Sequence, residues 1–178
     1  MDENKITAPE NLSRSELDEF WMRHAYALAE EARLQGEIPV GAIVVLDNQL
    51  IGEGWNQSIQ NSDPTAHAEM IALKQAGELI GNYRLIDTTL YVTLEPCPMC
   101  AGAMVHARVA EVVYGATDLK TGAAGSVFNL VNNPNLNHQL KVHSGVLEDE
   151  CSSKLSTFFR ARRKAHKEKK LLQKKNSY

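Results

Sequence analysis

The sequence predicts an α/β protein: a three-layer α/β sandwich in which helices flank both faces of a mixed β-sheet. Apolar segments of strand length alternate with segments that have the helical period of about 3.6 residues, which is the pattern of α/β domains. The chain has 178 residues, enough for one domain with its own core. It contains no internal repeat and no apolar run of about 18 residues, so neither a repeat architecture nor a membrane span is expected.

The first helix is expected to run from Ser15 to Leu34. Ser15 and Asp18 have the spacing of a helix-capping pair, and Gly36 follows the last apolar position as a typical terminator. Between them, six apolar side chains recur at helical spacing: Leu17, Phe20, Trp21, Ala25, Leu28 and Ala32. We therefore expect an amphipathic helix that packs one face against the sheet.

The later elements alternate between strands and helices. Five strands are expected, at residues 40–46, 50–54, 90–94, 109–114 and 140–142. Three more helices are expected, at residues 65–76, at residues 97–107 and from about residue 147 onward. Residues 117–137 contain Gly122, Gly125 and Pro134 and have neither period, so they are expected to form a loop.

Charge is distributed unevenly along a chain whose net charge is −3. Residues 160–175 carry nine of the 19 Lys and Arg but one of the 22 acidic residues, Glu168. An acidic body with a basic C-terminal helix indicates an anionic polymer as partner. The alternative is a solvated helix end, because cations also stabilise helix C-termini.

Two short motifs contain side chains of the kind that bind zinc. They are His67-Ala68-Glu69 and Pro96-Cys97-Pro98-Met99-Cys100. Zinc takes neutral imidazole and thiolate ligands in tetrahedral geometry, and its catalytic sites keep one position for water. His67, Cys97 and Cys100 supply three ligands, so the sequence predicts one zinc ion with an open position. Glu69 adds a carboxylate beside that position, and we expect it to transfer protons.

The spacing within each motif has a physical reason. Cys97 and Cys100 are three residues apart and share one face of a helical turn, which Pro98 can open without loss of a hydrogen bond. A helix N-terminus also stabilises thiolates. The preceding segment 63–65 is a helix start signal, so His67 is expected in the first turn of its own helix. The three ligands can meet if the two helix N-termini converge.

Other interpretations stay open on these residues alone. An isolated Cys-x-x-Cys motif also occurs as a redox dithiol or as half of a closed zinc site. A fourth protein ligand would make the site structural, and the candidates are Cys151, His24, His106, His138, His143 and His166. Three cysteines, two of them in a metal motif, do not form a disulfide framework. Together with a polar N-terminus that lacks an apolar signal segment, this predicts a cytoplasmic protein.

Several segments resemble the cytidine and deoxycytidylate deaminase superfamily, and within it the family of tRNA adenosine deaminases. The residues that carry the resemblance are 39–42, 52–56, 63–69, 83–85, 93–103, 120–126 and 158–160. The resemblance spans roughly residues 15–165 and implies the cytidine deaminase type of sandwich, with a five-stranded mixed sheet. It divides the chain into a mobile N-terminal extension (1–14), a zinc deaminase domain (15–165) and a basic C-terminal helix end or tail (166–178).

The resemblance also implies roles for residues outside the zinc motifs. Asn56 would contact the flipped base, and the backbone at Ala68 and at Glu95 would complete the pocket. Asn56 could instead cap a turn, and Glu95 could hydrogen-bond backbone at the helix start. Asp118 could accept a ribose hydroxyl or simply cap its loop. Lys120 and Arg160 are candidate phosphate contacts, as are Arg108, Arg162 and Arg163. Of Phe158 and Phe159, one is expected to pack and the other to stack on a base.

Three functions are compatible with these sequence features. The resemblance implies hydrolysis of adenosine to inosine at the wobble position of a tRNA anticodon loop, in an arginine tRNA, by a homodimer. A deaminase of a free base or nucleoside would use the same zinc chemistry, but has less need of the 120–126 segment and the basic helix. A noncatalytic, zinc-stabilised RNA-binding module has no need of Glu69.

Overall fold

A mixed five-stranded sheet forms the centre of the molecule. The computed structural model describes residues 6–175, and the strand order is β2-β1-β3-β4-β5. The strands are β1 (Gly41–Leu46), β2 (Gln49–Trp55), β3 (Thr89–Leu94), β4 (Glu111–Ala116) and β5 (Lys141–Ser144). β1 runs antiparallel to β2 and β3, whereas β3, β4 and β5 are parallel to one another. The five strands expected from the sequence are confirmed, with ends shifted by up to two residues.

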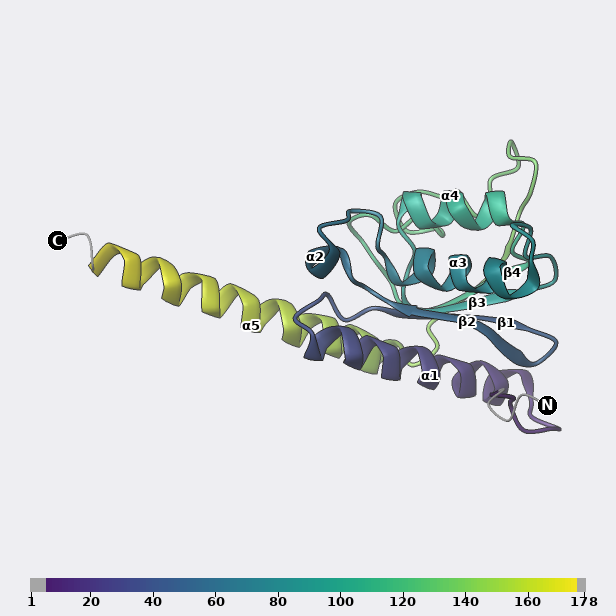
Figure 1. Ribbon diagram of the computed structural model, residues 1–178, viewed down its shortest axis with the longest axis horizontal. Helices are drawn as coiled ribbons and strands as arrows, with labels where there is room; N and C mark the ends of the chain where they lie inside the picture. Colours follow the sequence, from purple (N-terminus) through teal and green to yellow (C-terminus); the bar gives the residue numbers. More distant parts are fainter. Residues whose placement is uncertain (1–5, 176–178) are drawn as a thin grey trace.

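Helices cover both faces of this sheet (Figure 1). The helices are α1 (Arg14–Leu34), α2 (Ser58–Asn61), α3 (Ala68–Ile80), α4 (Pro98–Ala107) and α5 (Glu148–Lys175). α3 and α4 lie on one face, and α1 lies on the other together with the first part of α5. The three-layer sandwich is thus confirmed. The sequence pattern did not predict α2, because its four residues are too few for the helical period to show.

Successive side chains of each strand point to opposite faces of the sheet, so the hydrophobic core is divided into two clusters. Leu90 packs in the cluster under α3 and α4, and its neighbour Tyr91 packs in the cluster under α1. Val112 and Val113 divide in the same way, as the period of two requires. Gly52 on β2 allows α3 to approach closely, because a Cβ there would lie 2.3 Å from the carbonyl oxygen of Ala72.

Helix α1 begins one residue earlier than expected, at Arg14, and its N-cap lies two residues earlier. Ser13, not Ser15, is the N-cap, and it forms a capping box with Glu16: each side chain accepts a hydrogen bond from the other residue's backbone N–H. Such a cap stabilises a helix by about 1 kcal/mol. Asp18 is buried instead, where it accepts hydrogen bonds from Tyr91 Oη (2.9 Å) and Arg14 Nε (2.7 Å). The burial of Asp18 follows from its place on the sheet-facing side of α1.

The two ends of the described chain differ in their contacts with the sheet. The backbone N–H of Leu50 donates to the carbonyl oxygen of Ile6, and Ala8 is buried. These contacts restrict residues 6–13, while residues 1–5 of the expected mobile extension lie outside the described part. At the other end α5 projects well beyond the sheet (Figure 1), and the last three residues of the expected tail are not described. Within residues 6–175 no helix is long and apolar enough to cross a membrane.

An ion pair joins α5 to α1. Lys154 Nζ lies 2.6 Å from a carboxylate oxygen of Glu30 and 4.0 Å from the ring centroid of Tyr26. Hydrogen bonds from Arg33 and from Lys154 lower the pKa of Glu30 from 4.5 to about 2. Because the folded-state pKa is depressed, Glu30 adds stability above pH 4.5, and this contribution disappears as the pH falls towards about 2.

We therefore expect wild type to lose more stability than Glu30→Gln as the pH falls from about 5 to about 2. Urea midpoints measured across this range test the difference. Glu31→Gln is the matched control, because Glu31 is exposed and has no ion pair within the described residues. Equal pH dependence of wild type and Glu30→Gln would show that the Glu30 ion pairs do not contribute.

Candidate active site

Two helix N-termini bring the zinc-motif residues together. His67 is the N-cap residue of α3 and Cys97 that of α4, and neither side chain caps its own helix. His67 Nδ1 lies 3.6 Å from the Sγ of Cys97 and 3.6 Å from the Sγ of Cys100. Both helices begin later than expected, at Ala68 and Pro98. As a result, His67 and Cys97 lie just before a helix, where extended backbone turns them towards each other.

The arrangement of these three side chains fits a zinc ion. The ligand atoms of His67, Cys97 and Cys100 lie within 4.8 Å of one another. Tetrahedral zinc with bonds of about 2.0–2.3 Å holds its ligand atoms roughly 3.5–3.8 Å apart, which agrees with the two distances of 3.6 Å. The cluster accommodates one zinc ion and leaves its fourth position to a non-protein ligand.

The pKa values of the two thiols show why a cation suits this site. Hydrogen bonding from the Cys100 thiol and from the His67 ring lowers the pKa of Cys97 to about 4. The thiolate at Cys97 in turn raises the pKa of Cys100 far above its usual range. Two thiolates whose sulfur atoms lie within 4.8 Å of each other repel. A zinc ion between them supplies the positive charge that offsets this repulsion.

None of the candidate fourth ligands joins this cluster, which is the only such group within residues 6–175. His24 pairs with Glu53, and His143 pairs with Glu111. His138 bonds the carbonyl oxygen of Val109 at 2.7 Å. The thiol of Cys151 is buried, and it would lie 2.6 Å from a Cβ added at Gly115. Each of these four side chains thus has a structural place of its own, and His106 and His166 are not part of the cluster either.

Glu69 lies beside the cluster in the first turn of α3 and is 4 % exposed. Burial raises the pKa of its carboxyl to about 7, against the opposing effect of hydrogen bonds to the charged form and of His67. A carboxyl group with this pKa can both accept and release a proton near neutral pH. Glu69 also lines a cavity of about 520 Å³ together with His67 and Cys97.

Asn56 lines the same cavity at the end of β2 and is buried. Its Oδ1 accepts a hydrogen bond of 2.9 Å from the backbone N–H of Ala68, so Asn56 supports the start of α3. The N–H of Ala68 is therefore used within the protein. The Nδ2 of Asn56 has no partner within the described residues and is the donor left for a ligand.

Glu95 holds the loop that forms one wall of the cavity. Its buried carboxylate accepts hydrogen bonds from the backbone N–H groups of Asp118 (2.9 Å), Ala124 (3.1 Å) and Ser126 (3.0 Å), and from the Ser126 hydroxyl. The carboxylate is therefore fully occupied by the loop. Of the roles considered for Glu95, the geometry favours backbone hydrogen bonding.

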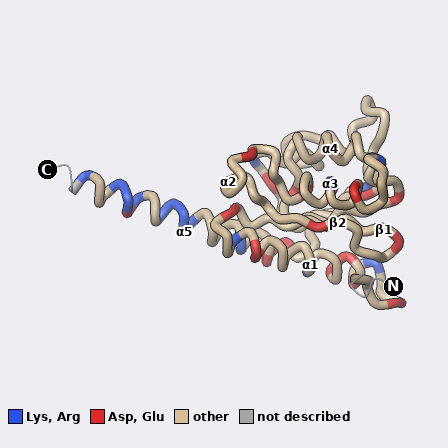
Figure 2. Tube along the Cα trace, viewed as in Figure 1, with Lys and Arg blue, Asp and Glu red and all other residues tan. Residues whose placement is uncertain are grey.

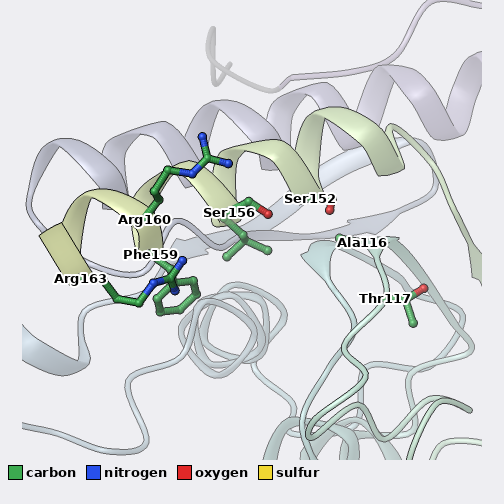
Figure 3. A pocket seen from close by; sticks show the side chains of 8 residues that line it. Ala116, Thr117, Ser152, Ser156, Phe159, Arg160 and Arg163 are labelled. Atoms are coloured by element: carbon green, nitrogen blue, oxygen red, sulfur yellow. The ribbon is translucent and has the colours of Figure 1, made fainter.

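The remaining site residues predicted from the sequence line two different hollows. Asp118, Lys120 and Phe159 line the cavity of the zinc-motif residues, and Asp118 also caps its loop by accepting from the N–H groups of Lys120 and Thr121. Arg160 is not part of that cavity. It lines an adjacent hollow of about 440 Å³ with Arg163 (Figure 3). Five apolar residues complete the cavity wall, and the sequence alone gave none of them a role in the site: Ile38, Val40, Leu94, Leu119 and Leu155.

Gly122 lets the loop approach Glu95. A Cβ at this position would lie 2.4 Å from the Glu95 carboxyl carbon and 2.5 Å from the Asp118 carbonyl oxygen. We expect Gly122→Ala to displace the loop, lower the melting temperature and raise KM. Gly102→Ala on α4 is the control, because a Cβ there meets no atom within 4 Å. Thermal melts and steady-state kinetics of both variants test this, and unchanged values for Gly122→Ala would contradict it.

The fold and the site together define the class of zinc-dependent deaminases. Residues 15–116 match the family model of the cytidine and deoxycytidylate deaminase zinc-binding region. A tRNA-specific adenosine deaminase of Haemophilus influenzae is 58 % identical over 160 residues, which are 89 % of this chain and 92 % of the relative. One of Bacillus subtilis is 47 % identical, over 84 % of this chain and 93 % of the relative. The chain belongs to the tRNA-specific adenosine deaminase family.

Solved structures also resemble this chain in fold. One from a study of A-to-I editing by tRNA:A34 deaminases has a TM-score of 0.74 at 40 % identity, and the match covers 76 % of this chain and 99 % of that one. A guanine deaminase from Nitrosomonas europaea has a TM-score of 0.68 at 20 % identity, over 88 % of each chain. At that identity the second structure supports the fold alone.

Proposed function

We propose that the protein hydrolyses adenosine to inosine at the wobble position of a tRNA, with an arginine tRNA as the expected substrate. The observation that carries this proposal is the cavity lined by His67, Cys97 and buried Glu69, with the Cys100 thiol beside the other two ligands. Homologues named tRNA-specific adenosine deaminases, at 40–58 % identity, support the choice of substrate. Action on a cytoplasmic RNA also supports a cytoplasmic location.

In the reaction, a C–O bond forms at C6 of adenine, the C–N bond to the amino group breaks, and ammonia leaves. When bound, zinc supplies hydroxide at neutral pH by lowering the pKa of water towards about 7. The Glu69 carboxylate accepts one proton of the attacking water and delivers it to the leaving nitrogen, and the second water proton ends on N1 of the inosine product. Asn56 Nδ2 donates to a ring nitrogen of the purine, and so orients the base.

An anticodon loop suits this cavity because its unstacked bases can be extruded at low cost. Phe159 is 38 % exposed at the cavity wall, where its ring can stack on a neighbouring base. Asp118 and Lys120 line the same cavity and offer contacts to ribose and phosphate. The 120–126 segment and α5 supply a surface for RNA that a free-base enzyme has less need of.

The direct test is incubation of the zinc-loaded protein with unmodified tRNA, adenosine, cytosine and guanine, followed by nucleoside and base analysis. Inosine from tRNA alone is the expected result. Deamination of a free base or nucleoside in preference to tRNA would replace this proposal by the small-molecule alternative. Zinc binding with no turnover of any substrate would leave a noncatalytic module.

We also propose that the protein is a homodimer through the outer side of α3 and α4. Apolar groups of Met70, Tyr83, Ala103 and Ala107 line a shallow hollow there, and Tyr83 is 71 % exposed. A twofold pairing would cover this surface, and such dimers are the commonest oligomers. Sedimentation is expected to show a dimer at micromolar concentration, and Tyr83→Asp is expected to weaken it. A monomer at all concentrations would contradict the dimer.

A further inference from the structure

Basic side chains form one row along α5. This helix is continuous over Glu148–Lys175, so successive residues are turned by about 100° around its axis. Residues spaced alternately by three and four positions therefore share a face. Five cations have this spacing, and we call them the α5 row: Arg160, Arg163, Lys167, Lys170 and Lys174.

The α5 row begins at the mouth of the candidate active site. Arg160 and Arg163 line the hollow shown in Figure 3, together with the hydroxyl residues Ser152 and Ser156. Phe159 lines both this hollow and the cavity that contains Glu69. A polynucleotide with one base in the cavity would pass Phe159 and meet the first two cations of the row.

No ion pair among the described residues neutralises the row. All five side chains are exposed, and none forms an ion pair within residues 6–175. Glu168, the one acid in residues 160–175, directly follows Lys167 and so points to another face. Like charges three and four residues apart repel one another and destabilise an isolated helix. A bound polyanion would remove this repulsion along the whole row.

The length of the row indicates what kind of polyanion fits. From Arg160 to Lys174 it extends about 21 Å along the helix axis, and this part of α5 points away from the body with Lys and Arg along it (Figure 2). A flexible loop bound at the cavity needs only the first cations. A straight row that continues outward suits a rigid, regular line of phosphates, such as one strand of a double-stranded stem.

We propose that the outer α5 row, Lys167, Lys170 and Lys174, binds the phosphate backbone of the double-stranded stem next to the deaminated loop. This inference rests on the proposed function for the position of the loop. The stem then adds affinity through counterion release, without any contact to the bases. Arg162 and Lys169 lie on a different face of α5 and are predicted to take no part.

Two double variants with the same loss of charge test the proposal. Lys167→Gln/Lys170→Gln removes two charges from the row, and Arg162→Gln/Lys169→Gln removes two from a different face. Glutamine keeps the helix propensity, and circular dichroism checks that α5 is retained. Binding of a stem-loop RNA and of a single-stranded RNA with only the loop sequence is measured by fluorescence anisotropy across salt concentrations.

For the row variant we expect the Kd of the stem-loop to rise about tenfold, with a salt slope shallower by about 2. Its affinity for the single-stranded RNA should be unchanged, and the control variant should bind both RNAs like wild type. Unchanged stem-loop binding by the row variant, equal weakening for both RNAs, or equal weakening by the control would each overturn the proposal. If wild type made no inosine from any RNA, the proposed function itself would be refuted, independently of the result for the stem.

Discussion

Replacing Glu69 with glutamine is expected to lower turnover by roughly 10²–10⁴-fold, while zinc content and fold stay unchanged. The reason is that Glu69 is buried beside the zinc ligands but is not one of them. Glutamine keeps the shape of the side chain but cannot accept and release the proton. The measurements are inosine formation by nucleoside analysis and zinc content by elemental analysis.

Glu78→Gln is the matched control for this variant. Glu78 lies on the same helix, is largely exposed, and has only a loose pair with Lys74 at 3.9 Å, so activity should be unchanged. If Glu69→Gln kept more than about a tenth of the wild-type rate, Glu69 would not be the proton shuttle. Glu95, the other buried acid at the cavity, would be a poor replacement because the loop donors occupy its carboxylate.

Replacing Cys97 with alanine is expected to remove the zinc, abolish activity and lower the melting temperature. Cys97 supplies one of three protein ligands, and the binding free energy of a metal contributes to folding when the unfolded chain lacks the site. A chelator should therefore lower the melting temperature of wild type and leave that of the variant unchanged. Elemental analysis and thermal melts with and without chelator provide the readouts.

Cys151→Ala is the control for loss of a buried thiol. Cys151 packs against β4 away from the ligand cluster, so this variant should keep a full zinc content while it loses some stability to a cavity. Stoichiometric zinc in the Cys97→Ala protein would contradict the assignment of Cys97 as a ligand.

The candidate active site was predictable where the chemistry depends on residue type and spacing. His67, Cys97 and Cys100 were identified because few side chains bind zinc, and the structure brings their ligand atoms together. The contact of Asn56 with Ala68 was not predictable, because it joins the end of β2 to the start of α3. The same holds for Glu95, whose partners lie 23 to 31 positions further along the chain.

The sequence by itself determined the α/β class, the five strands and the chemistry of the zinc site. These depend on local periodicity and on the limited set of residues that coordinate zinc. Only the tertiary structure decided that His67 and Cys97 are helix N-caps, that Glu95 is occupied by the loop, and that Arg160 faces a separate hollow. Each of these features depends on which segments the sheet brings together. Contacts between segments that are remote in the chain produce no periodic pattern in a single sequence, so they could not be predicted from it.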